Sequence, residues 1–326
     1  MNTQIALAGT IFVTFLWGSW FQTVKHTGNF PVHAFISMMY AVSVVIVWGA
    51  IGFLGAEMVP HGVLNEMTGN RPLALLVFAC GLVFGVAMQL QLTVVKRIGL
   101  ILSTSVSATC SILGGTAVSM MFAGIPEGVS IVILVTAAVL LILAAILCQL
   151  AGSRRDREAG RLEEQSSRAK DVLFLVFINL VLMSSYPLAT SMGLRSPLRP
   201  EGFASLTCMG LLVVGACIGS SGFTFLSWKK EENWRKRKEV PMARLLFLAM
   251  LAAFCHFGGN VLHAVFAPVV SVAIATVMGN SYHCWSYIWG LVYGEFKGAS
   301  GKTCLMLGSG ILMFLAGVVL LSLEIV

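Results

Sequence analysis

Several amide and imidazole side chains lie inside long apolar stretches of this sequence, where polar groups are costly to bury. His256, Asn260 and His263 are separated by four and three residues, so a helix would place them on one face. Asn280 and His283 lie three apart in the next apolar stretch. Amides and imidazoles donate and accept hydrogen bonds without a fixed charge, and imidazole also carries a proton near neutral pH. The pattern indicates a site for a small neutral polar molecule.

Ten polar and aromatic side chains are candidates for lining one substrate site. They are Trp17, Trp20, Gln89, Tyr186, His256, Asn260, His263, Asn280, His283 and Trp285. The alternative is that such groups hydrogen-bond neighbouring helices, because these bonds contribute about 0.6–2 kcal/mol and membrane bundles use them freely. That alternative is favoured for Gln91, Asn179 and residues 103–111, and it stays open for the histidine and asparagine stripe. An interfacial aromatic belt is slightly favoured over a stacking wall for Trp17 and Trp20.

The 35 charged residues avoid the middle of the apolar stretches. A membrane-embedded Asp or Glu is the usual mark of a proton or sodium relay, and a carrier of anions is expected to keep a Lys or Arg at this depth. Phosphorylated sugars and nucleotide sugars are therefore disfavoured as substrates. The candidates for carrying a proton are His256, His263 and His283, because histidine titrates near neutral pH.

Cysteine and histidine also occur as neighbours, with Cys255 beside His256 and Cys284 beside His283. Adjacent residues on a helix point about 100° apart, so each pair is poorly placed to share one metal ion. No metal site and no cofactor are expected. The eight cysteines lie inside or at the edge of apolar stretches, which favours small apolar packing residues over a disulfide framework.

The composition identifies the elements that must position these residues. Mean hydropathy is +0.89, and only 11% of residues are charged, against about 25% in soluble chains. Because a helix needs roughly 20 apolar residues to cross a bilayer, the sequence predicts an all-α integral membrane protein with ten transmembrane helices. The ten stretches are approximately residues 4–21, 34–53, 72–91, 99–120, 129–150, 172–191, 203–225, 242–266, 268–293 and 303–323.

The cations predict an orientation. All but three of the 21 Lys and Arg residues fall in the loops that ten crossings would place on one side, and the exceptions are Arg71, Arg195 and Arg199. Cations favour the cytoplasmic side, so we expect cytoplasmic charged loops and both termini outside. The expected location is the plasma membrane, or the inner membrane of a bacterium. The net charge of +7 is attributed to this topology and not to nucleic-acid binding.

A charged linker at residues 151–171 divides the chain into a first repeat, residues 1–150, and a second repeat, residues 172–326. Five crossings is an odd number, so a second copy must enter the membrane from the opposite face, which predicts a 5+5 inverted repeat. Residues 121–148 and 292–322 share a weak pattern of an aromatic, two glycines, a glutamate and a long apolar run. Two GxxxG spacings, at Gly81 with Gly85 and at Gly215 with Gly219, predict close helix packing.

Residues 18–52, 255–267 and 286–321 carry a family resemblance. They resemble the ureide permease group of the drug/metabolite transporter superfamily, a neighbour of the bacterial glucose/ribose and rhamnose porters. The last stretch is the most specific and contains Trp289, Gly290, Gly294, Glu295, Phe296, Lys297, Ser300, Lys302 and Thr303. The resemblance implies a ten-helix inverted repeat with a central cavity that imports neutral heterocycles or sugars with protons. By motif, Asn260 and Glu295 match family positions, and Glu295 is expected to pin a loop. The short central loop departs from the plant members.

The sequence therefore predicts a secondary active transporter that moves a small neutral polar metabolite by alternating access. A ureide, nucleobase or nucleoside-like solute imported with protons is placed slightly ahead of a sugar. A proton symporter for glucose-, ribose- or rhamnose-type sugars and a drug/metabolite exporter are the alternatives. A membrane enzyme is disfavoured, because no acid lies in the apolar core. The expected partners are the solute, protons and the lipid bilayer, and a homodimer stays open.

Overall fold

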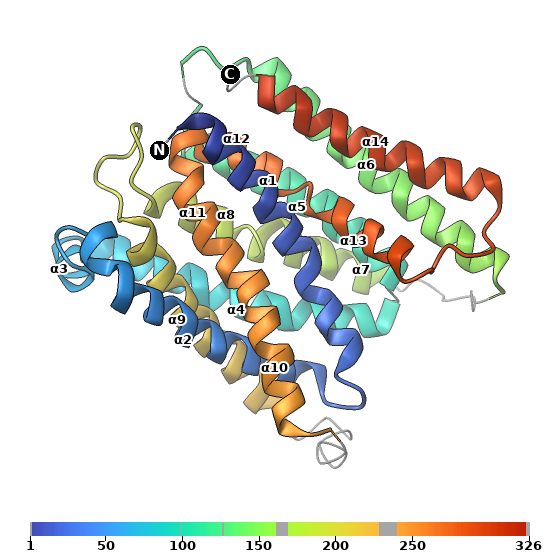
Figure 1. Cartoon of the computed structure of the whole chain (residues 1–326), viewed down its shortest axis with the longest axis horizontal. Coiled ribbons are helices and arrows are strands. Elements are labelled where there is room, and N and C mark those ends of the chain that lie inside the picture. Colours follow the sequence, from blue (N-terminus) through green and yellow to red (C-terminus); the bar gives the residue numbers. More distant parts are fainter. Residues whose placement is uncertain (1, 99, 126, 161–168, 228–239, 324–326) are drawn as a thin grey trace.

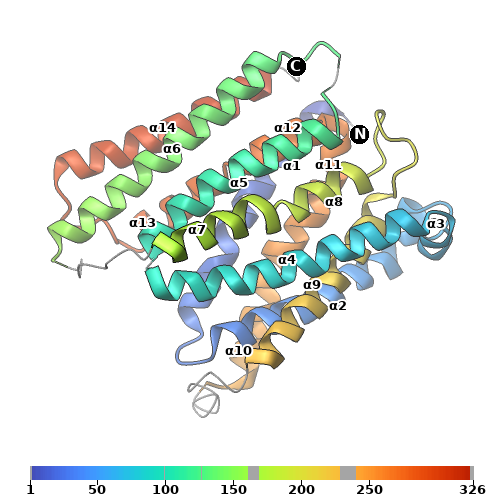
Figure 2. The ribbon, with the colours of Figure 1, turned by 180° about the vertical axis from the view of Figure 1, so that it is seen from behind.

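The computed structural model describes residues 2–98, 100–125, 127–160, 169–227 and 240–323 (Figures 1 and 2). These residues are mostly helical and include no named strand, although two isolated bridges occur between Leu194 and Phe203 and between Ser196 and Arg199. Eight helical stretches are long and apolar enough to cross a membrane. The described chain is thus an all-α membrane protein, in agreement with the composition. Residues 161–168 of the predicted linker lie outside the described residues.

The helices follow the apolar stretches in order. In the first half they are α1 (Thr3–Ser19), the 3-10 segment η1 (Trp20–His26), α2 (Val32–Met58), α3 (Val63–Gly69), α4 (Arg71–Ile98), α5 (Leu100–Phe122) and α6 (Ile131–Glu158). In the second half they are α7 (Ala169–Phe177), the π segment η2 (Ile178–Leu182), α8 (Ser185–Gly193), α9 (Ser205–Ser227), α10 (Met242–Ala253), the π segment η5 (Phe254–Gly258), α11 (Gly259–Val270), α12 (Val272–Gly279), α13 (Tyr282–Val292) and α14 (Gly301–Leu323).

The expectation of one continuous helix over residues 268–293 is wrong. Pro268 lies inside α11, and the chain turns only at Ser271, whose φ of 112° is positive. Helix α12 then ends at Gly279 and α13 begins at Tyr282, so the stretch is broken again. Membrane helices tolerate proline because neighbouring helices and side chains satisfy the freed backbone groups.

Two glycine pairs bring α4 and α9 into close contact. A Cβ atom on Gly81 would collide with the backbone carbonyl of Leu212, and one on Gly85 with that of Ala216. Gly215 and Gly219 meet the α4 backbone in the same way. Side-chain-free positions four residues apart allow this approach, so the packing role predicted for both GxxxG spacings is confirmed.

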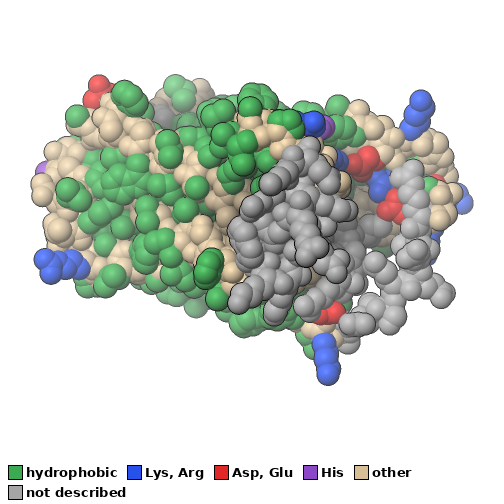
Figure 3. All heavy atoms as spheres, turned by 90° about the horizontal axis from the view of Figure 1, so that it is seen from below, with side chains coloured by type: hydrophobic (Ala, Val, Ile, Leu, Met, Phe, Trp, Pro, Cys, Tyr) green, Lys and Arg blue, Asp and Glu red, His purple; other side chains and the backbone are tan. Residues whose placement is uncertain are grey.

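The bundle has two ends, and one pair of helices forms its edge and packs on α5 and α12. Helices α6 and α14 lie side by side along one edge, as both ribbon views show (Figures 1 and 2). We call the end that bears the N-terminus, α3 and residues 194–203 the terminal end. The end that bears residues 20–31, 151–160 and 293–300 is the cationic end. In Figure 3, hydrophobic side chains cover much of the described surface, and charged groups gather toward the ends and beside the grey atoms.

Candidate functional site

The predicted histidine and asparagine stripe lies where its helix departs from α geometry. His256 belongs to the π segment η5, which joins α10 to α11, and Asn260 and His263 follow on α11. All three side chains are buried, at 5%, 3% and 0% exposure. A π segment adds one residue to a helical turn and is frequent at functional sites. The neighbouring Gly259 has no side chain at the point where the indole of Trp17 packs.

Aromatic rings enclose the stripe. The Trp17 ring centroid lies 5.1 Å from that of His263 and 5.8 Å from that of Tyr186. The Trp20 ring meets His256 edge-on at 4.9 Å. The Tyr186 hydroxyl is 3.1 Å from Nδ1 of His263, which ties α8 to α11. The two tryptophans therefore face the interior of the bundle, and the interfacial belt favoured for them is wrong.

The break between α12 and α13 supplies the second predicted pair. Asn280 lies at the end of α12 and His283 in the first turn of α13, and both side chains face the same interior space as the stripe. Gly279, just before the break, has room for the Trp17 ring and none for a Cβ atom. The irregular backbone thus brings Trp17 against two different helices at once.

These groups line one cavity of about 400 Å³. Eight of the ten predicted residues line it, and they are Trp17, Trp20, Tyr186, His256, Asn260, His263, Asn280 and His283. The volume falls within the range of roughly 300–1,000 Å³ that is usual for small-molecule sites. The cavity is bounded by α1, η1, α4, α5, α6, η2, α8, η5, α11, α12 and α13, so both predicted repeats contribute to it.

Gln89 and Trp285, also predicted for the site, lie away from the cavity. The Gln89 amide oxygen is 2.6 Å from Nδ1 of His33, and its nitrogen donates to Ser220 at 2.7 Å. Gln89 is fully buried in this polar contact between α2, α4 and α9. Trp285 packs edge-on against Phe15 and donates from Nε1 to the Thr14 hydroxyl at 2.9 Å. The structure gives both residues helix-joining contacts.

The cavity has further lining residues that the sequence pattern does not indicate as a site. For Gln91 and Asn179 the sequence favours helix contacts, yet both line the cavity. Each keeps one helix bond, from Gln91 to the Ser107 hydroxyl and from Asn179 to the Leu175 carbonyl. The remaining unpredicted lining residues at membrane depth include Phe84, Met88, Ser111, Gly115, Met183, Ser184, Pro187, Thr276, Tyr282, Ser286 and Tyr287.

The cavity collects polar atoms that have no protein partner. Fourteen buried side-chain nitrogen or oxygen atoms of the described residues lack a hydrogen bond. Nine of them belong to residues that line the cavity, on Trp17, Gln22, Gln91, Asn179, His256, Asn260, His263, Asn280 and His283. An unsatisfied buried polar group costs about 1–3 kcal/mol, so such a concentration in one place calls for a bound partner.

An ion-pair cluster stands at the cationic end of the cavity. Glu295, in the turn after α13, accepts hydrogen bonds from Lys25 Nζ at 2.8 Å and from Arg155 Nη1 at 2.9 Å. All three residues line the cavity, and their side chains are 37%, 44% and 16% exposed. Burial raises the pKa of Glu295, but the bonds and charges of Lys25 and Arg155 lower it further, so the net pKa lies below the usual value.

At the terminal end, a buried carboxylate and an arginine join α3, the segment 194–204 and the end of α5. Glu66 of α3 is almost completely buried and accepts from Arg195 Nη2 at 2.7 Å and from the Ala204 backbone nitrogen at 3.1 Å. Arg199 donates from Nε to the Phe122 carbonyl at 2.8 Å. None of these residues lines the cavity. The cavity therefore extends from mid-bundle to the cationic end only.

The described residues hold no group of three or more His, Cys, Asp or Glu side chains that could bind a metal ion. All eight cysteines are free. Glu295 is the one acid among the described residues that line the cavity, and it is engaged by two cations. What the arrangement offers to a ligand is hydrogen bonding and aromatic stacking.

Comparison with known proteins identifies the fold alone. No protein-family model matches the sequence, and no curated protein matches it either. Nine chains of solved structures match the fold. One of them, described only as a crystal structure of a protein, superposes with a TM-score of 0.68 at 14% sequence identity. The match covers 99% of this chain and 98% of the other, so the whole architecture occurs in another protein.

Proposed function

We propose that the chain is a secondary transporter that carries a small neutral polar solute across a membrane by alternating access. The observation that carries this proposal is the set of nine unpartnered polar atoms around one cavity of about 400 Å³ inside a membrane bundle. A solute that satisfies these atoms would offset a desolvation cost that the protein alone leaves unmet. The aromatic rings of Trp17, Trp20 and Tyr186 would hold its flat or apolar face.

The types of unpartnered atom favour a solute that both donates and accepts hydrogen bonds. Trp17 Nε1, Asn260 Nδ2 and Asn280 Nδ2 offer donors, and the oxygens of Gln91 and Asn179 offer acceptors. No charged side chain lines the middle of the described cavity, which disfavours anions and cations. A ureide, nucleobase or nucleoside-like solute has this mixed amide pattern. A sugar, with hydroxyl groups that donate and accept, is the second candidate.

The proposed architecture has ten crossings in a 5+5 inverted repeat. Besides the eight long helices, α5 and the broken pair α12 and α13 would be the fourth and ninth crossings. The N-terminus and the end of α14 lie at the same end, as an even number requires (Figure 1). Corresponding helices also make corresponding contacts: α1 packs on α11 and α13, and α8 packs on α4 and α5. Helix α2 packs on α9, and α6 packs on α14. In a 5+5 repeat these would be the second and seventh crossings and the fifth and tenth, so each helix would contact its own counterpart in the other repeat.

The orientation follows from the cations. The terminal end carries Arg71, Arg195 and Arg199, while most of the described Lys and Arg residues stand at the cationic end. By the preference of cations for the cytoplasmic side, the cationic end would be cytoplasmic, in a plasma membrane or a bacterial inner membrane. Both termini would then be outside, and the cavity would face the cytoplasm.

Membership of the ureide permease-like group of the drug/metabolite transporter superfamily is part of the proposal, and it rests on the sequence resemblance at residues 18–52, 255–267 and 286–321. Import with protons is the favoured direction, and export of a drug or metabolite is the alternative. The proton carriers would be His256, His263 and His283, because all three line the cavity. If uptake and its pH dependence were unchanged in each His→Ala variant, the proton role would be wrong.

Ligand-induced stabilisation of the purified protein tests the proposed site. Nucleobases, ureides, nucleosides and sugars would be screened by thermal shift, since a ligand at 100 times its Kd stabilises the folded state by about 2.7 kcal/mol. Asn260→Ala should abolish the shift. Ser191→Ala is the matched control, because Ser191 Oγ is equally buried and unpartnered but lies outside the cavity. Loss of the shift in both variants would contradict this site.

Flux into liposomes distinguishes the classes of function. A carrier should accumulate the stabilising solute unchanged, with saturation and with counterflow of preloaded solute. Chemical conversion of the solute would identify a membrane enzyme, and unsaturable flux would identify a channel. Either result would overturn the proposed function.

A further inference from the structure

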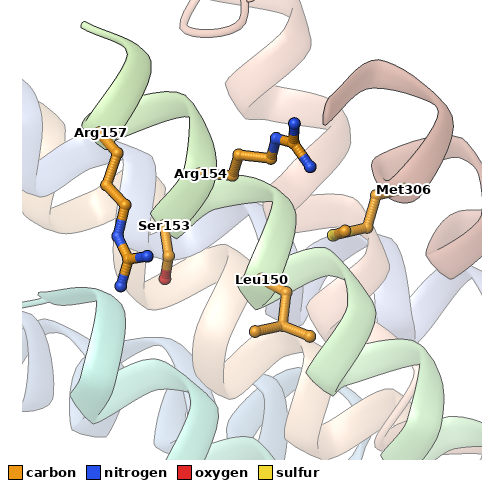
Figure 4. Close-up of a pocket in the computed structure, with 5 residues that line it drawn as sticks. All are labelled: Leu150, Ser153, Arg154, Arg157 and Met306. Carbon is orange, nitrogen blue, oxygen red and sulfur yellow. The ribbon is translucent and has the colours of Figure 1, made fainter. Parts of the chain in front are cut away.

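A second cavity lies at the cationic end of the α6–α14 pair, and it shares no residue with the first. It has a volume of about 390 Å³ and is lined by Leu150, Ser153, Arg154, Arg157 and Met306. In Figure 4 the two guanidinium groups lie on either side of the Ser153 side chain, with Leu150 further along α6 and Met306 opposite on α14. The α6 side thus carries both arginines, Ser153 and the apolar Leu150, and α14 contributes the apolar Met306.

This groove continues the outward-facing stripe of α6. Val135, Val139, Leu143, Ile146 and Leu150 are exposed and follow one another at intervals of three or four residues. Exposed apolar side chains with helical spacing on a membrane bundle face the lipid acyl chains. Ser153, Arg154 and Arg157 extend the same stripe by the same spacing. The arginines therefore stand on the lipid-facing side, at the depth where apolar residues give way to polar ones.

The positive charge of the two groove arginines is only partly neutralised by acids of the described residues. Arg154 pairs with Glu158 at 3.1 Å, but that carboxylate also accepts from the Ser300 backbone nitrogen and from the Ser300 and Thr303 hydroxyls. Arg157 is exposed and forms no ion pair with any residue of the described chain. The adjacent Arg155, in contrast, turns inward to Glu295.

We propose that the α6–α14 groove binds the phosphate headgroup of an anionic lipid. Arginine forks match phosphate oxygens, and the Ser153 hydroxyl would add a donor. The acyl chain would lie against Leu150 and Met306, where free phosphate has nothing to contact. Basic pockets between transmembrane helices commonly hold acidic headgroups. The proposal needs the membrane setting but not the proposed transport activity.

Native mass spectrometry of the delipidated full-length protein tests the proposal. Phosphatidylglycerol and phosphatidylcholine with the same acyl chains would be titrated, with inorganic phosphate as the third ligand. Phosphatidylglycerol should bind selectively, and Arg157→Gln should weaken its binding about fivefold, with a similar effect for Arg154→Gln. Arg157→Gln breaks no ion pair within the described residues and so should fold normally.

Arg244→Gln is the matched control, because Arg244 is an exposed cation in the first turn of α10, outside the groove. It should leave phosphatidylglycerol affinity unchanged. Equal binding of phosphatidylcholine would overturn the proposal, as would an equal loss in Arg244→Gln. Binding of inorganic phosphate as tight as that of phosphatidylglycerol would identify a free-anion site and overturn the lipid assignment.

Discussion

The helices and loops at the two ends of the bundle are joined by different kinds of contact: a buried carboxylate at the terminal end and partly exposed ion pairs at the cationic end. At the terminal end, Glu66 has a side chain only 4% exposed and bonds both Arg195 and a backbone nitrogen. At the cationic end, the Glu295 side chain is 37% exposed and bonds Lys25 and Arg155. A buried carboxylate with backbone support is costly to release, whereas partly exposed ion pairs contribute about 0–1 kcal/mol each.

The cavity lies at the end that has the partly exposed ion pairs. Glu295, Lys25 and Arg155 line the cavity, and no residue of the Glu66 contact does. The cavity thus reaches the cationic end and not the terminal end in this conformation, and the contacts at the cationic end are the weaker ones. For a carrier that alternates its access, the Glu66 contact would have to break in the opposite half of the cycle.

The largest effect is expected from breaking the Glu66 contact at the terminal end. Glu66→Ala removes the carboxylate that pairs with Arg195 and leaves the Ala204 backbone nitrogen without an acceptor. Unfolding free energy should fall by about 2–3 kcal/mol, visible as a lower melting temperature in detergent. Hydrogen exchange should become faster in residues 194–204 and stay unchanged in residues 290–300.

Two further variants sharpen that result. Glu66→Gln keeps an acceptor for the Ala204 nitrogen, so its loss should be smaller. Glu57→Ala removes an exposed acid at the end of α2 and should behave like the unmodified protein. If Glu66→Ala and Glu57→Ala melted at the same temperature, the buried contact would not be what stabilises this end.

Much of the framework could be predicted from the sequence, because it depends on the number of apolar residues in a row. Apolar stretches located the long helices, and glycine spacing predicted close packing of α4 and of α9 but not that these two helices contact each other. The break at Ser271 and the π segment at His256 could not be predicted, because contacts with the rest of the bundle influence local backbone geometry.

The sequence predicted which types of residue line the candidate site better than it predicted which side chains point into the cavity. Gln89 and Gln91 are two positions apart on α4, so their side chains point to different sides of the helix. Gln91 faces the cavity and Gln89 faces His33, the reverse of the predicted assignment. Hydropathy predicts that a helix spans the membrane but not how the helix is rotated about its own axis. Rotation is set by the neighbours, and the histidine stripe was found because three polar groups marked one face.

A smaller effect is expected from loosening the cationic end. Glu295→Gln removes the charge that joins η1, α6 and the turn after α13. The melting temperature should fall less than in Glu66→Ala, because the ion pairs are partly exposed and contribute at most about 1 kcal/mol each. Hydrogen exchange should become faster in residues 290–300 and not in residues 194–204. Lys297→Gln, an exposed neighbour outside the described ion pairs, is the control and should leave both segments unchanged.

The pH dependence of this variant separates the ion-pair cluster from the histidines. Because the pKa of Glu295 lies below its usual value, its ion pairs persist above the ordinary carboxyl pKa and are lost only as the pH falls through the lowered one. Between pH 5.5 and 8 the cluster stays charged, so the difference in exchange between Glu295→Gln and the unmodified protein should be constant. A difference that disappears at pH 5.5 would show that Glu295 itself titrates there. A constant difference would leave His256, His263 and His283 as the cavity-lining groups to test for any pH dependence of uptake in this range.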